Sequence, residues 1–125
     1  MTAAAYAPKP DPGAVLAKAT IRAAALMGLS GAVLAKVIGL SEASISRMSA
    51  GERPIMPSTK EGELAALLVR VYRSLDAMVG NDEQRRMDWL TGYNDHLNGI
   101  PKELLKTAQG LVRVVTYLDG MRAVS

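Results

Sequence analysis

The sequence predicts an all-helical protein, and three observations support this prediction. Apolar residues recur with the period of an amphipathic helix along most of the chain. Glycine or proline interrupts these periodic segments, and a serine or threonine that can cap a helix often lies beside the interruption. No segment alternates apolar and polar residues over the length of about four to eight residues typical of a half-buried strand. We therefore expect an all-α fold.

The first half of the chain is expected to contain three helices and a linker. Ser30 and Ser41 are placed to cap the second and third helices, and Gly39 is placed to end the second. Two prolines in the segment 52–57 forbid a continuous helix there and make it a semi-rigid linker. The three helices are expected at about 14–27, 31–38 and 42–50.

The second half is expected to contain four more helices. The segment Ser58-Thr-Lys-Glu61 matches a capping box, in which Ser58 accepts from the backbone amide of Glu61 while Glu61 reaches back. Gly120 is expected to close the last helix, which leaves Met121 to Ser125 as a short tail. The helices are expected from the capping box to about Val79 and then at about 82–91, 101–105 and 108–119.

Composition limits the chemistry that the chain can perform. The absence of cysteine excludes disulfides, thiol chemistry and cysteine-based metal sites, and it fits a cytoplasmic location. His96 is the only histidine, and we expect Asp95 and His96 to be a solvated loop pair rather than catalytic groups. Arg85 and Arg86 are expected on a solvated face. We expect a protein that is not an enzyme and that uses no cofactor and no metal.

Charge and hydropathy point to a polyanionic partner and to no membrane. Lys18 and Lys36 interrupt the longest apolar stretches, which fall short of the ~20 residues of a membrane span. Residues 1–11 have no basic region followed by a long apolar run, so we expect a flexible tail and not a signal peptide. Residues 1–57 carry six Lys or Arg and three Asp or Glu, whereas residues 58–125 carry nine of each. A basic first half favours a polyanionic partner.

Residues 31–50 have the pattern of a helix-turn-helix motif. Ala35 is small, as required where the two helices cross closely, and Gly39 lies in the turn, where a positive φ favours glycine. Five apolar residues are placed to form the core that sets the angle between the two helices: Leu34, Ile38, Leu40, Ile45 and Met48. Residues 12–57 are therefore predicted to be a helix-turn-helix DNA-binding domain and its linker, although a helix pair that binds only protein remains an alternative.

The second helix of such a motif enters the major groove of DNA. Arg47 can bind guanine with two hydrogen bonds, and small polar residues beside it can reach a base or a phosphate. Lys36 and Arg53 are candidates for phosphate contacts, whereas Glu42 suits the positive N-terminal end of its helix. The residues expected to contact DNA are Lys36, Ser41, Ala43, Ser44, Ser46, Arg47 and Arg53.

The order of motifs after residue 74 resembles the toxin-binding domain of the MbcA/ParS/Xre antitoxins. A helix end at Val79-Gly80 is followed by the pair Trp89-Leu90, by a loop containing Asn94 and Leu97-Asn-Gly-Ile-Pro101, and by Leu104-Leu105-x-Thr107-x-x-Gly110. The helix-turn-helix motif before it is similar to that of the Xre members. Val79 stands where an aromatic residue is common, and no proline precedes Asn94. Residues 58–125 are accordingly expected to bind a toxin and to dimerise.

The resemblance implies a type II antitoxin whose partner is a RES-domain toxin, an enzyme that degrades NAD. Such an antitoxin covers the active site of the toxin, forms a homodimer within a larger toxin–antitoxin complex, and binds operator DNA. The residues expected to contact the toxin are Val112, Tyr117, Leu118 and Met121 as an apolar face and Arg122, Ala123, Val124 and Ser125 as an inserted tail.

Three alternatives to these assignments stay open. Val112 and Tyr117 can instead pack on a neighbouring helix or in a homodimer, and Trp89 is expected in the core. The chain as a whole can be a free-standing transcriptional repressor with a C-terminal dimerisation domain. It can also be an adaptor that binds only protein.

Overall fold

The computed structural model describes residues 11–124, and it confirms the all-helical prediction. Within this range the only strand-like feature is an isolated bridge between Asn94 and Gly99. The predicted N-terminal tail, apart from Asp11, and Ser125 lie outside the described residues. The helices are α1 (Pro12–Leu26), α2 (Gly31–Ile38), α3 (Glu42–Ser49), α4 (Lys60–Val79), α5 (Glu83–Thr91), α6 (Pro101–Leu104) and α7 (Ala108–Ala123).

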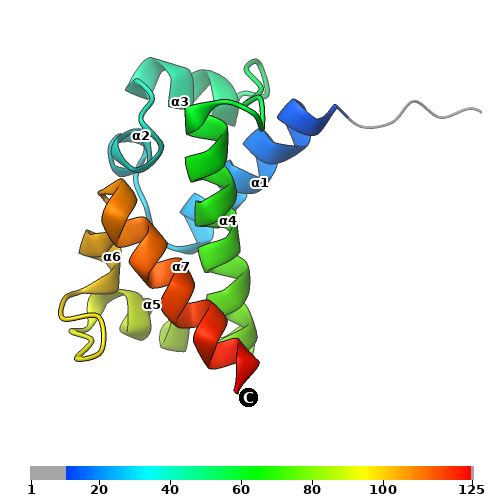
Figure 1. Cartoon of the computed structure of the whole chain (residues 1–125). Coiled ribbons are helices and arrows are strands. Elements are labelled where there is room, and N and C mark those ends of the chain that lie inside the picture. The colour runs from blue at the N-terminus through cyan, green and yellow to red at the C-terminus, as the bar shows by residue number, and fades with distance from the viewer. Residues whose placement is uncertain (1–10, 125) are drawn as a thin grey trace, which may run out of the picture.

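Helix α4 runs through the middle of the molecule and belongs to both halves of the fold (Figure 1). Helices α1 and α2 pack against it on the N-terminal side, and α5 and α7 pack against it on the C-terminal side. The buried apolar side chains form one continuous cluster that includes Met27 of α1, Leu68 and Leu75 of α4, and Leu111 of α7. The two halves of the sequence therefore share a single hydrophobic core.

A side chain caps the start of each described helix except α6, whose N-cap is Ile100. Ser30 accepts from the amide of Val33 at 3.2 Å and Ser41 accepts from the amide of Ser44 at 3.1 Å, as predicted. The capping box predicted at Ser58 is wrong, because Thr59 is the N-cap of α4 and accepts from the amide of Gly62 at 3.1 Å. The Thr59 hydroxyl also donates to the carbonyl of Met56 at 2.7 Å, which orients it for this role.

The predicted linker, residues 52–57, contains no helix and is anchored in its middle. The side chain of Ile55 is 1% exposed and belongs to the core. Its amide donates to the carbonyl of Gly13 at 3.1 Å, which ties the linker to the first turn of α1. This anchor sets the position at which α4 begins relative to the helix-turn-helix motif.

Arg86 is buried, so the prediction that it lies on a solvated face is wrong. Its side chain is 2% exposed, and its guanidinium group lies over the ring of Tyr72, 5.5 Å from the ring centre. Nη2 donates to the carboxylate of Asp76 at 3.1 Å, and Nη1 donates to the carbonyl of Leu26 at 3.3 Å. One side chain of α5 thus links the end of α1 to the last turn of α4, whereas the neighbouring Arg85 is exposed.

Candidate functional site

The helix-turn-helix motif consists of α2, a short turn and α3, as the sequence predicts. Gly39 has a φ of +75°, in the left-handed region that favours glycine, and nothing would obstruct a side chain there. Ala35 is 6% exposed, which agrees with a close approach of the two helices. Four of the five predicted core residues are buried, namely Leu34, Ile38, Ile45 and Met48, and Leu40 packs against them while partly exposed.

The outer face of α3 is polar and exposed except at one position. Ser41, Ala43, Ser46 and Arg47 are exposed, so they are available for contacts in a groove. Ser44 was expected on this face but is only 7% exposed. Its hydroxyl accepts from Ser41 Oγ at 3.0 Å and from Arg47 Nη2 at 3.3 Å. Ser44 therefore positions its neighbours, because it lies one helical turn from both.

The cationic residues of this region differ in exposure. Lys36, in the last turn of α2, and Arg47, in the last turn of α3, are exposed. Neither forms an ion pair with any described residue, so both charges are available to an anion. Arg53 differs, because it is only partly exposed and its Nη1 atom is buried without a hydrogen-bond partner among residues 11–124.

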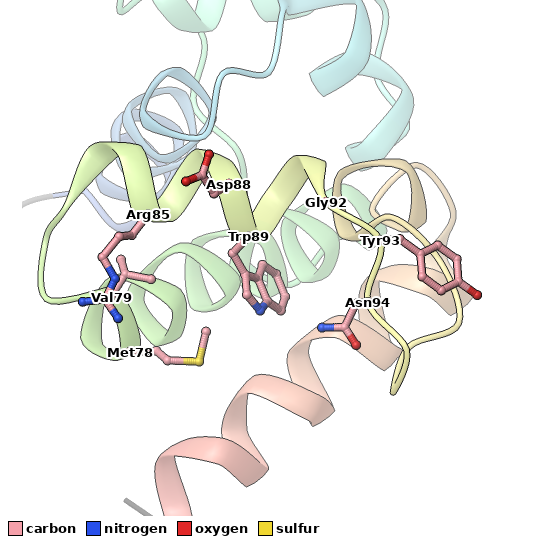
Figure 2. Close-up of a pocket in the computed structure, with 8 residues that line it drawn as sticks. All are labelled: Met78, Val79, Arg85, Asp88, Trp89, Gly92, Tyr93 and Asn94. Carbon is pink, nitrogen blue, oxygen red and sulfur yellow. The ribbon is translucent and has the colours of Figure 1, made fainter.

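A pocket of about 530 Å³ lies between the end of α4, helix α5 and the loop that follows it (Figure 2). Met78 and Trp89 lie on the same side of α5 (Figure 2). The polar side chains of Arg85 and Asp88 also line the pocket. Trp89 is half-buried, and its ring stacks on that of Tyr117 with 6.3 Å between the ring centres. The pocket was not anticipated from the sequence, because its lining residues come from three segments.

Tyr117 is the centre of an aromatic stack that joins α5, α7 and the loop at residues 92–100. On its second side it stacks on His96, 5.8 Å away between ring centres. The loop is held by reciprocal backbone bonds between Asn94 and Gly99 and by the amide of Leu97, which donates to Asn94 Oδ1 at 2.9 Å. His96 is thus exposed but packed, and Tyr117 is partly buried rather than free on the surface.

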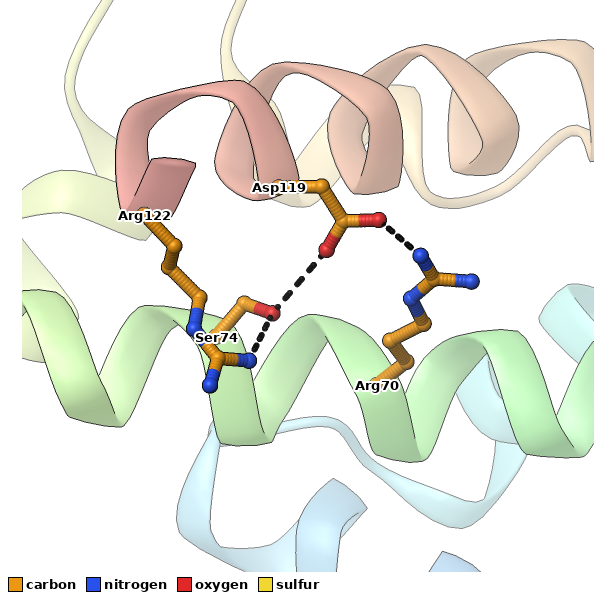
Figure 3. A network of polar contacts seen from close by, with 4 residues as sticks. All are labelled: Arg70, Ser74, Asp119 and Arg122. Carbon is orange, nitrogen blue, oxygen red and sulfur yellow. Dashed lines mark hydrogen bonds and ion pairs between the residues drawn. The ribbon is translucent and has the colours of Figure 1, made fainter. Parts of the chain in front are cut away.

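A polar network joins the end of α7 to α4 (Figure 3). Asp119 accepts from Arg70 and, at 3.3 Å, from the hydroxyl of Ser74, which is 1% exposed. Ser74 in turn accepts from Arg122 Nη1 at 3.2 Å. Arg122, which was expected to insert into a toxin site, therefore contacts α4 in this structure.

Two expectations for the C-terminal end are wrong. Gly120 does not end the last helix, because α7 continues to Ala123 and the network at Asp119 and Arg122 holds its final turn against α4. Leu118 is not part of an exposed face, because it is fully buried in the core. Exposed apolar side chains do occur on α7 and at its end: Val112 is 49% exposed, Met121 39% and Val124 81%, and Ala123 is also exposed.

Among the described residues, one exposed carboxyl group, that of Glu103, has a clearly shifted pKa. Lys106 lowers the pKa of Glu103 by a hydrogen bond of 2.7 Å and by its positive charge, and this pair lies at the surface, with Glu103 in the short helix α6 and Lys106 just after it. No three His, Cys, Asp or Glu side chains of residues 11–124 are grouped as a metal site would require. None of the helices in this part of the chain is both long enough and apolar enough to cross a membrane.

Two family models match the chain, one for each half. Residues 7–70 match the model of the antitoxin Xre-like helix-turn-helix domain. Residues 74–123 match the model of the antitoxin Xre/MbcA/ParS C-terminal toxin-binding domain. A comparison with curated proteins found no significant match. With the helix-turn-helix geometry of α2 and α3 and the helices packed behind it, these matches show that the chain belongs to the Xre-type antitoxins.

Proposed function

We propose that this antitoxin neutralises a RES-domain toxin that degrades NAD, by covering the active site of that enzyme. We also propose that it binds operator DNA and represses its own operon. The observation that carries the proposal is that one chain combines a polar, exposed α3 with a toxin-binding domain whose last helix ends in exposed apolar side chains. Such a protein can hold DNA at one end and an enzyme at the other.

A cytoplasmic homodimer within a larger toxin–antitoxin complex suits both roles. A two-fold pair presents two copies of α3 to half-sites about 34 Å apart on DNA. The positive charge of the first half is then doubled, which strengthens attraction to the phosphate backbone. The exposed cations Lys36 and Arg47 supply part of that attraction.

The toxin contact is proposed at the C-terminal end of α7. An α-helix turns by about 100° per residue, so Met121 and Val124 lie near one side of α7 and Val112 lies on the side opposite Met121. Met121 also borders a second hollow, of about 250 Å³, with Met78, and Met78 is shared with the pocket beside Trp89. Met121, Val124 and Met78 are therefore proposed to form a broken apolar surface that a toxin can bury.

Co-purification tests the toxin proposal. The full chain, tagged at its N-terminus, is purified gently from its native host, and the proteins that accompany it are identified. We expect a small enzyme in near-stoichiometric amount that consumes NAD only after the two proteins are separated. Recovery of the antitoxin alone as a dimer would contradict the toxin assignment and favour a free-standing repressor.

Matched variants then locate the contact. Met121→Asp is expected to raise the Kd for the toxin at least about tenfold, because it places a charge in a desolvated apolar contact. Val112→Asp introduces the same charge at a similarly exposed site on the other side of α7 and serves as the control. Equal losses from the two variants would contradict a contact confined to the Met121 side of α7, and an unchanged Kd in Met121→Asp would place the contact elsewhere.

Operator binding is tested separately with DNA from upstream of the gene. Binding that weakens steeply as salt increases is expected for a protein that neutralises phosphates. No salt-dependent binding, alone or with the toxin, would leave an adaptor that binds only protein.

A further inference from the structure

A cavity of about 720 Å³ lies behind the helix-turn-helix motif, on the N-terminal side of the molecule and away from the toxin-binding domain. Helix α1 forms one wall, and the end of α3 with the following turn forms the other. The small side chains of Ala17 and Ala25 on α1 leave space that Ile21 and Met48 border with apolar groups. This volume falls in the range of about 300–1,000 Å³ that is typical of small-molecule sites.

Three cations border this apolar space. Lys18 and Arg22 come from α1, and Arg53 comes from the linker, residues 52–57. None of the three forms an ion pair with a residue in the range 11–124. Two carboxylates also border it, Asp11 and Glu52.

The two carboxylates do not neutralise the site. The carboxylate of Asp11 is engaged as the N-cap of α1, where it accepts from the amides of Gly13 and Ala14, each at 3.3 Å. The three cations outnumber the two acids around the cavity, and one of these acids already has hydrogen-bond partners.

Arg53 carries the strongest indication of a ligand. Its Nη1 atom is buried and has no hydrogen-bond partner among the described residues. A buried donor without a partner costs free energy, and a carboxylate can relieve that cost by accepting from two guanidinium nitrogens at once.

We propose that this cavity binds a small amphipathic anion, a carboxylate with an apolar body. The carboxylate pairs with Arg53, which turns its guanidinium group toward the cavity, and Lys18 and Arg22 add attraction at the rim. The apolar body lies along Ala17, Ile21 and Met48. Because Met48 belongs to α3, the ligand contacts the back of the DNA-facing helix, and occupancy is expected to change operator affinity. The expected change in operator affinity rests on the proposed operator binding, whereas the binding of the anion does not.

The test titrates the full chain with decanoate, followed by calorimetry and by the methyl resonances of Ile21 and Met48. We expect saturable binding of one decanoate per chain with shifts at these two methyl groups. The probes 1-decanol and decyltrimethylammonium have the same apolar body without the negative charge and are expected to bind at least about tenfold more weakly.

Two variants with matched controls locate the site. Arg53→Met is expected to raise the decanoate Kd about tenfold, and Arg73→Met, on the exposed surface of α4, is expected to leave it unchanged. Ala14→Leu fills the cavity from an exposed position of α1 and is expected to abolish saturable decanoate binding. Ala66→Leu makes the same change at an exposed position of α4 and is expected to leave decanoate binding unchanged.

Several outcomes would overturn the proposal. They are no saturable decanoate binding, equal affinity for 1-decanol, shifts outside this cavity, and unchanged affinity in Arg53→Met. Conversion of a dimer to monomers by Ala14→Leu, without decanoate binding to the parent chain, would instead assign the cavity to a second copy of the protein.

Discussion

At the residue scale, Arg86 shows how a charged side chain can be a core residue. Its guanidinium group contacts the ring of Tyr72, the carboxylate of Asp76 and the carbonyl of Leu26. No sequence pattern near Arg86 predicts these partners. The burial of Arg86, unlike its partners, has one local signal in the sequence. Arg86 lies one helical turn before the fully buried Leu90 and shares its side of α5.

Arg86→Met is therefore expected to destabilise the protein by about 2–3 kcal/mol, because it leaves the Leu26 carbonyl and the Asp76 carboxylate without their donor. The free energy of unfolding, measured by urea titration, checks this. Arg85→Met changes an exposed neighbour and is expected to stay within about 0.5 kcal/mol of the parent. Similar losses in both variants would show that the contacts of Arg86 contribute little.

A second residue-scale prediction concerns Arg47 and Lys36 in DNA binding. Arg47→Ala is expected to weaken operator binding by about 1–3 kcal/mol and to relax preference at one base pair, as loss of a base contact does. Lys36→Ala is expected to weaken binding to all DNA sequences alike. It is also expected to reduce the slope of log affinity against log salt concentration by about one, as loss of a phosphate contact does. Fluorescence anisotropy with operator and scrambled DNA separates the two, and identical behaviour of the variants would refute these roles.

At the scale of the element, α7 was correctly expected as a helix but its end was misplaced. Glycine ends many helices, so Gly120 was a reasonable terminus, yet it lies inside α7. The contacts of Asp119 and Arg122 with Ser74 on α4 hold the last turn, and they depend on a partner helix far away in the sequence. The two glycines inside α7 also differ from each other, because Gly110 lies against the backbone of Leu104 and Gly120 has open space around it.

Gly110→Ala and Gly120→Ala are expected to change stability in opposite directions. A Cβ at Gly110 would lie 2.0 Å from the carbonyl oxygen of Leu104, so the substitution must displace backbone and is expected to cost about 1–3 kcal/mol. A Cβ at Gly120 meets nothing within 4 Å, and alanine there is expected to stabilise the helix by about 0.5–1 kcal/mol. Thermal unfolding followed by circular dichroism measures both, and a shift of the same sign in the two variants would contradict the packing at Gly110.

At the scale of the whole molecule, α4 joins the two family domains through one hydrophobic core. The boundary between the family matches falls within α4, and buried residues of both halves join in one core. The sequence indicated a division near residue 57, where two prolines interrupt the helices. That division stays a prediction about domain organisation. Prolines interrupt a helix, but they do not by themselves separate the hydrophobic cores on either side of them.

We expect the chain to unfold in a single transition. Fluorescence of Trp89, which reports on α5, and far-ultraviolet circular dichroism, which reports on all helices, should give the same midpoint in urea. Two separated midpoints would show that the helix-turn-helix region and the toxin-binding domain unfold independently despite their shared helix.

The sequence by itself determined the helices, the caps at Ser30 and Ser41 and the helix-turn-helix motif. These features depend on residues a few positions apart, as when Ser41 caps α3 or Gly39 adopts a positive φ. Only the tertiary structure decided which side chains are enclosed. Arg86 and Leu26 lie 60 positions apart, and Ser74 and Arg122 lie 48 apart. A side chain is buried when residues distant in the sequence pack around it, and local periodicity cannot specify which distant residues these are.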